Sequence, residues 1–192
     1  MGPMPRKTTE LTARTLRALA HPLRMRLLEL LRVDGPATAS GLGKRLGESS
    51  GTTSWHLRQL AEHGFVEEDT ERGNRRERWW RAVHESHRLN ANQFAGDPEL
   101  AGPLNAYLMT ALERRYEREV RFFGEADKWR ESWGDAPNFS DYNLSLTPDE
   151  AQALSAEVDA LIDRYRREPR EGDSTAVAHW AVFPRDHHPE QP

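Results

Sequence analysis

The chain has 192 residues, 36% of them hydrophobic and 30% charged, which is enough for one domain with a real core or for two small ones. It has no run of the roughly eighteen apolar residues that a membrane span needs and no apolar signal region at its N-terminus, so a cytoplasmic protein is expected. The formal net charge is −4, and the absence of cysteine excludes disulfides, thiolate metal sites and cysteine nucleophiles.

Two short helices are expected after a frayed leader at residues 1–9. Leucines mark a first helix, which is interrupted at His21-Pro22 because proline suits the first turn of a helix and breaks its interior. The second helix begins at Pro22 and ends at Asp34-Gly35-Pro36. The leucines of the two helices are Leu11, Leu16, Leu19, Leu23, Leu27, Leu30 and Leu31.

A third helix is expected after Thr38, and a fourth after Ser49 or Ser50, because these side chains suit the N-cap position. The fourth helix is predicted to bury Ser54, Leu57, Leu60 and Ala61. Gly64 is placed as its C′ residue.

A two-stranded wing is predicted next. Residues 65–68 form its first strand, and the Gly73-Asn74 pair is a strong signal for a hairpin turn. A run rich in arginine and tryptophan supplies the second strand, where either Trp79 or Trp80 should seal the core. Helix, turn, helix and wing in this order predict a winged helix-turn-helix domain over residues 10–90.

The remaining sequence predicts two further elements. Apolar residues at steps of four and three after Asp97-Pro98 indicate a long amphipathic helix of about eight turns within residues 97–134. Residues 139–184 are expected to form a β-α-β unit, with strands near 142–146 and 175–183. Thr147-Pro148-Asp149-Glu150 matches a capping box before its helix. The expected fold class is mainly α with small β (α+β).

Residues 21–31, 54–68 and 72–80 together resemble the signatures of ArsR-like bacterial transcriptional regulators. The resemblance covers roughly residues 11–82 and implies a homodimeric DNA-binding regulator, often a repressor that an effector releases. The metal-sensing branch of that family typically uses cysteine ligands or His/Asp pairs, and this chain lacks the cysteines. No effector follows from the resemblance.

The fourth helix is expected to read DNA. Its core-facing stripe turns Thr52, Trp55 and Gln59 outward, toward base edges. Thr52 and Thr53 can donate hydrogen bonds to bases or touch a thymine methyl, and Gln59 suits adenine. Trp55 is expected at a base or sugar, with packing on the third helix as the alternative. The complete predicted DNA-binding set is Lys44, Arg45, Ser50, Thr52, Thr53, Trp55, His56, Arg58, Gln59, Arg72, Arg75 and Arg76.

Several members of this set are predicted to meet phosphates instead of bases. His56 and Arg58 flank the reading face, although a structural hydrogen bond is an equal alternative for His56. Lys44 and Arg45 either contact the phosphate backbone of DNA or lie on a face of the helix that is exposed to solvent. Arg72 and Arg75 are placed at the wing tip, near the minor groove.

The two halves of the chain differ in charge. Residues 1–96 hold 16 Lys and Arg against 11 Asp and Glu, whereas residues 97–192 hold 11 against 20. The basic half is therefore expected to meet nucleic acid, and the acidic half a partner, an effector or solvent. The predicted dimer interface lies on the long helix, at Leu104, Leu108, Leu112 and Tyr116.

No cofactor, metal site or enzymatic activity is expected, because His84, His87 and the His187-His188 pair have no third ligand at useful spacing and no catalytic motif is present. The prediction is a sequence-specific repressor that binds double-stranded DNA at an inverted repeat as a homodimer. One alternative is a regulator with an organic effector in its C-terminal half, within an aromatic pocket. The other is a winged-helix interaction module that no longer binds DNA.

Overall fold

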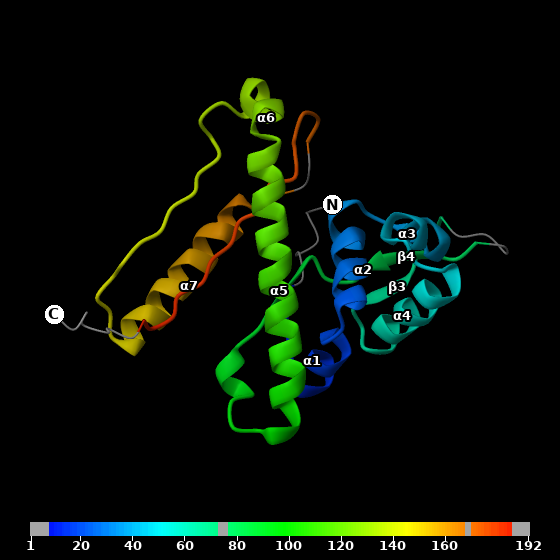
Figure 1. Cartoon of the computed structure of the whole chain (residues 1–192), viewed down its shortest axis with the longest axis horizontal. Helices are drawn as coiled ribbons and strands as arrows, with labels where there is room; N and C mark the ends of the chain where they lie inside the picture. Colours follow the sequence, from blue (N-terminus) through cyan, green and yellow to red (C-terminus); the bar gives the residue numbers. More distant parts are fainter. Residues whose placement is uncertain (1–7, 73–76, 168–169, 186–192) are drawn as a thin grey trace. The chain divides into compact units, whose positions relative to one another are not determined.

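The computed structural model describes residues 8–72, 77–167 and 170–185 (Figure 1). The chain forms two compact units, one of residues 5–136 and one that contains residues 137–192. Helices dominate the larger unit, whereas the second unit has a single helix among its described residues. None of the described helices is long and apolar enough to cross a bilayer.

Four short helices begin the larger unit, as the sequence predicts. Each is capped at its N-terminus by a side chain that accepts a backbone N–H: Thr12, His21, Thr38 and Ser49. Ser49, and not Ser50, is therefore the cap of the fourth helix. The helices are α1 (Ala13–Leu19), α2 (Pro22–Val33), α3 (Ala39–Leu46) and α4 (Ser50–Glu62).

Two small sheets complete this part of the unit. The antiparallel wing has the order β2 (Ala37–Thr38), β4 (Trp79–Ala82) and β3 (Val66–Glu68). The second sheet pairs β1 (Thr8–Glu10) with β5 (Ser86–Arg88) in parallel. Residues 8 and 9, expected within a frayed leader, instead begin a strand, which the hydrogen bond between the Thr8 and Ser86 hydroxyls supports at 2.8 Å.

The core lies between the helices and the wing and is built mainly of leucines. Val66 of β3 and Phe65 directly before it close the core on one side, and Trp80 closes it from β4. Its fully buried leucines come from each of the four helices: Leu16, Leu19, Leu27, Leu28, Leu42, Leu57 and Leu60. The predicted α+β winged helix-turn-helix fold is confirmed.

The predicted long helix is two helices. A short 3-10 turn, η1 (Ala91–Gln93), leads into α5 (Pro98–Gly124), and α6 (Ala126–Trp133) follows after a break at Glu125. Glu125 leaves helical geometry at φ −116°, directly after a glycine, which is a poor helix former. Leu100 and Tyr107 bury one face of α5 against the winged-helix core.

The second unit contains α7 (Pro148–Tyr165), whose capping box is confirmed: the Thr147 N–H donates to the Glu150 carboxylate at 2.7 Å. The predicted β-α-β arrangement is wrong. Residues 139–147 and the described residues 170–185 form no strand, and nearly all of their side chains are exposed. A parallel pair of strands needs cover on both faces, and one short helix provides too little of it.

Candidate nucleic-acid interface

The turn between α3 and α4 is tight because glycines occupy its critical positions. Gly47 ends α3 in the left-handed region at φ +70°. A Cβ atom at Gly43 would lie 2.7 Å from the Glu48 carbonyl oxygen and 3.0 Å from the Thr53 hydroxyl. Only glycine therefore allows the two helices to approach this closely.

Thr53 lies at that close approach, and this corrects its predicted role. The side chain is fully buried, and its hydroxyl donates to the Ser49 carbonyl oxygen at 3.0 Å. It cannot reach a base edge from there. The buried stripe of α4 is Thr53, His56, Leu57 and Leu60, whereas Ser54 and Ala61 are only half-buried.

His56 is also part of the core, and its Nδ1 has no hydrogen-bond partner among the described residues, so the structure supports neither the predicted phosphate contact nor the structural hydrogen bond. It is 6% exposed, and its ring lies 4.4 Å from the ring of His21, between centroids. Burial, together with the positive charges of His21 and Arg24, lowers the pKa of His56. The imidazole is in edge-to-face contact with Trp55, with 4.7 Å between the ring centroids.

The exposed face of α4 keeps the other predicted reading residues. Ser50, Thr52 and Arg58 are exposed, and Trp55 leaves 49% of its surface in water. Gln59 is half-buried, and its amide donates to the Glu62 carboxylate at 3.4 Å. The reading surface is consequently polar at its edges with a large apolar group in the middle.

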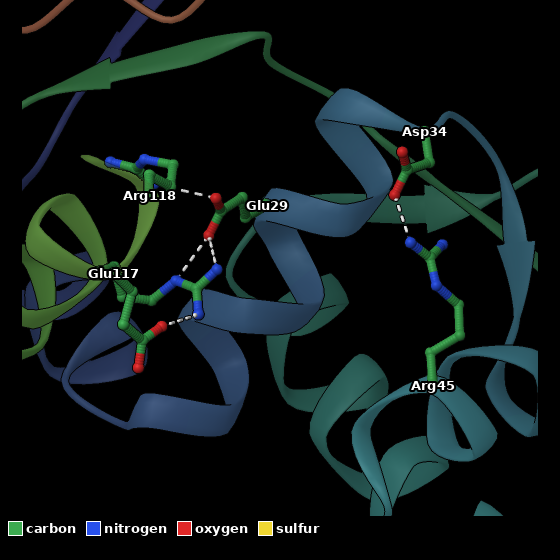
Figure 2. A network of polar contacts seen from close by, with 6 residues as sticks. Glu29, Asp34, Arg45, Glu117 and Arg118 are labelled. Atoms are coloured by element: carbon green, nitrogen blue, oxygen red, sulfur yellow. Dashed lines mark hydrogen bonds and ion pairs between the residues drawn. The ribbon is translucent and has the colours of Figure 1, made fainter. Parts of the chain in front are cut away.

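The positive charges near this face differ in how they are neutralised. The Arg45 guanidinium contacts the Asp34 carboxylate at 2.7 Å (Figure 2). Lys44 and Arg58 are exposed and, among the described residues, take part in no ion pair. These two side chains are therefore the cations most available to phosphate.

The wing carries arginines that its own first strand neutralises. Arg81 pairs with Glu67 at 2.9 Å across the β3–β4 ladder, and Arg78, directly before β4, pairs with Glu68 at 3.1 Å. Arg72 contacts the buried Asp69 at 3.6 Å. Arg75 and Arg76 lie outside the described residues.

The two wing tryptophans divide as the alternation predicts. Trp80 is 6% exposed and seals the core, and the Arg78 guanidinium lies 5.9 Å from its ring centroid. Trp79 is half-buried on the opposite face.

An ion-pair cluster joins α5 to α2. The Glu29 carboxylate accepts from Arg114 Nε at 2.6 Å and from Arg118 at 2.9 Å, and Arg114 also reaches Glu117 at 3.2 Å (Figure 2). The side chains of Glu29, Arg114 and Arg118 are each at most one-third exposed. The cluster fixes the orientation of α5 against the domain that carries α4.

A second polar connection between α2 and α5 is buried. Arg32 donates to the His84 carbonyl oxygen at 2.8 Å and lies 2.7 Å from His87 Nδ1, while His87 Nε2 lies 2.6 Å from the Tyr107 hydroxyl. Burial, followed by the charge of Arg32, lowers the pKa of His87 to about 4. Burial also raises the pKa of Tyr107 to about 12.

Sequence reasoning missed both connections, since the contacts between elements join residues 20 to 89 positions apart along the chain. Glu29, Arg32, Arg114 and Arg118 resemble ordinary exposed helix charges in the sequence. The spacing of His84 and His87 was the one visible signal. No cluster of three or more His, Asp or Glu side chains suited to a metal occurs among the described residues.

The four residues predicted for a dimer interface differ in burial and fall into two pairs. Leu104 and Leu108 are half-buried against the winged-helix core and line a groove of about 430 Å³ beside η1. Leu112 and Tyr116 are 56% and 68% exposed. The exposed stripe continues along α5 with Val120 and Phe123.

Comparison with known proteins identifies a helix-turn-helix domain in the larger unit. Residues 19–69 match a family described as a helix-turn-helix domain, so the chain contains such a domain. An apo structure of a double mutant of ZitR from Lactococcus lactis is 13% identical with a TM-score of 0.34, and the match covers 77% of this chain and 84% of that one. A second structure of this ZitR mutant is 13% identical with a TM-score of 0.33, covering 76% and 75%. The comparison with curated proteins gave no match.

Proposed function

We propose that this chain is a cytoplasmic, non-enzymatic transcriptional regulator that binds double-stranded DNA in a sequence-specific manner through α4. The observation that carries the proposal is the exposed face of α4. Thr52, Trp55 and Arg58 project from a helix whose opposite face is fully committed to the core. A major groove is wide enough to admit such a helix and presents a distinct pattern of groups at each base pair.

The electrostatics of the domain support the same function. Lys44 and Arg58 flank the reading face without neutralising partners among the described residues, and they are suited to phosphates on either side of the groove. The stem of the wing is internally neutral, since Arg78 and Arg81 pair with Glu68 and Glu67. For the wing we keep Arg75 and Arg76 as proposed phosphate contacts.

The regulator acts as a homodimer, and its interface is the exposed stripe of α5. Leu112, Tyr116, Val120 and Phe123 lie on the face of this helix opposite to the one that packs on the winged helix, and each is at least half exposed. Contiguous apolar surface of this kind usually marks an interface. A two-fold axis across it would give two copies of α4, matched to an inverted-repeat operator with half-sites about one helical turn apart.

Repression is the expected sign of regulation, because a dimer seated on an operator blocks access to it. An organic effector is a second candidate feature, favoured by the groove beside η1. That groove is lined mainly by apolar residues and touches α5 at Leu104 and Leu108. An apolar ligand there would act directly on the helix that carries the dimer interface.

The test begins with selection of bound sequences from a random DNA library by the full chain. Affinity for the selected operator is then measured against salt, where the logarithm of affinity should fall linearly with the logarithm of salt concentration. Arg58→Ala should make this slope shallower by about one unit. Arg130→Ala is the matched control, because Arg130 is exposed on α6 and should leave the slope unchanged.

Two results would contradict the proposal. Selection that enriches no sequence would remove sequence-specific reading. A complete lack of salt-dependent DNA binding would favour an interaction module built on a winged helix.

A further inference from the structure

Trp55 is the largest apolar group on the exposed face of α4, and packing within the chain covers only about half of it. Half of its surface is in water, although it is the sixth residue of a helix that begins at Ser50. In helix-turn-helix proteins the N-terminal residues of this helix are the ones that contact base edges. Its position is therefore one from which a base can be read.

The surroundings of Trp55 leave room for a base. Helical side chains lean toward the N-terminus of their helix, so Trp55 is directed toward the turn that contains Gly51 and Thr52. Gly51 has no side chain, and a Cβ atom there would approach only the Ser49 hydroxyl, at 3.7 Å. The opposite edge of the indole is fixed by the His56 ring at 4.7 Å, which is itself held against His21.

Two polar side chains near Trp55 are engaged within the chain. The Thr52 hydroxyl lies 2.9 Å from the Ser49 hydroxyl, and the Gln59 amide contacts Glu62. The largest exposed group that the first turns of α4 offer to DNA is the apolar indole of Trp55. The major-groove edge of a base pair carries one apolar group, the 5-methyl group of thymine.

We propose that Trp55 and the methyl group of Thr52 form a binding site for the 5-methyl group of thymine, and that each operator half-site contains a thymine at this position. The inference rests on the proposed function, because it names the base that the same helix recognises. It also makes Trp55 the specificity-determining residue of the reading face.

Replacement of thymine by uracil tests this directly, since uracil lacks only the methyl group and keeps every hydrogen-bonding group. In the selected operator, each thymine is replaced in turn and binding to the full chain is measured. One position in each half-site should weaken binding about four-fold, and replacement in both half-sites about fifteen-fold. Trp55→Ala should bind the thymine and uracil operators equally well.

Arg58→Ala is the matched control, because loss of a phosphate contact should weaken both operators and keep their ratio. Circular dichroism of Trp55→Ala should be that of the parent, since the side chain is exposed. An operator that is bound specifically, with no thymine position sensitive to loss of the methyl group, would overturn the inference and leave the proposed function intact. The same holds if Trp55→Ala retains the parent's discrimination. Failure to select any operator would instead overturn the proposed function itself.

Discussion

The buried imidazole of His87 makes the stability of the larger unit depend on pH. Its pKa is lowered to about 4 by burial and by Arg32, whereas an unfolded histidine titrates near 6.5. Between these two values the unfolded chain binds more protons than the folded one, so the free energy of unfolding falls as pH decreases through this window. From pH 7 to pH 5 the share of His87 in this loss is about 2 kcal/mol.

Urea unfolding of the parent and of His87→Gln at pH 7 and pH 5 checks this expectation. The parent should lose more stability on acidification than the variant, by about the 2 kcal/mol that His87 contributes. His21 and His56 also have lowered pKa values and remain in both proteins, so their shares cancel in the comparison. Equal acid sensitivity of the two proteins would show that His87 is not held neutral.

Thr52 and Thr53 are neighbours with opposite expected effects. Thr53→Ala removes a buried hydroxyl that donates to Ser49, and it should cost about 1–2 kcal/mol of unfolding free energy. Its preference for operator over random DNA should be unchanged. Thr52→Ala changes an exposed side chain, so it should leave the melting temperature nearly unaltered and weaken operator binding. A reversed pattern in thermal melts and DNA titrations would restore Thr53 to the reading face.

The sequence predicted only in part which side chains of α4 are buried and which are exposed. Leu57 and Leu60 defined its buried side correctly, and with them the outward placement of Thr52 and Trp55. Thr53 and His56 were misplaced because polar side chains are usually exposed, and here each is buried with a partner of its own. Such partners come from the turn and from α2, which no local pattern reveals.

At the scale of elements, Glu29 is expected to determine how firmly α5 is attached to the winged helix. Glu29→Ala would leave Arg114 and Arg118 without their shared carboxylate in a setting that is at most one-third exposed. Removing one member of such a cluster leaves uncompensated charge, and a loss of about 1–3 kcal/mol is expected after allowance for solvent. Glu117→Ala is the control, because Glu117 contacts the same Arg114 but is 54% exposed. Urea midpoints of the two variants should therefore differ clearly, and equal midpoints would contradict this role of Glu29.

The apolar residues of α5 wind around the helix, and this explains why its sequence predicted the helix but not its two apolar faces. Its predicted stripe advances mostly in steps of four residues, and each step turns the helix about 40° past one full turn. From Leu100 to Tyr116 this drift sums to about 160°, so the stripe winds from one side of the helix to the other. The burial follows it, from 3% exposure at Leu100 to 68% at Tyr116. The existence of the helix was predictable, but its two separate apolar faces were not read from the spacing.

The segments around α7 contain a sequence pattern typical of a strand but form no strand. Residues 142–146 alternate like a half-buried strand, yet they form none. A strand is stabilised by its neighbours in a sheet, and alternation alone does not supply a neighbour. The capping box of α7 was predicted correctly because all of its hydrogen bonds are local.

At the scale of the whole molecule, the two faces of α5 give a sharp test of assembly. Leu108 is half-buried against its own winged helix, whereas Leu112, four residues later, is 56% exposed. Burial of a glutamate carboxylate without a partner has a large free-energy cost, whether the burial occurs on folding or on dimer formation. Leu108→Glu should therefore lower the unfolding free energy, and Leu112→Glu should leave the fold intact and yield a monomer in sedimentation.

The monomeric Leu112→Glu protein would then occupy one half-site at a time. Its affinity for a single half-site should equal that of the parent, while its affinity for the complete inverted repeat should fall by at least ten-fold, because the second half-site no longer binds as part of one assembly. Measurements on both DNAs separate loss of assembly from loss of reading. A Leu112→Glu variant that remains a dimer with full operator affinity would contradict an interface on this stripe of α5, since the introduced charge would then have met no partner surface.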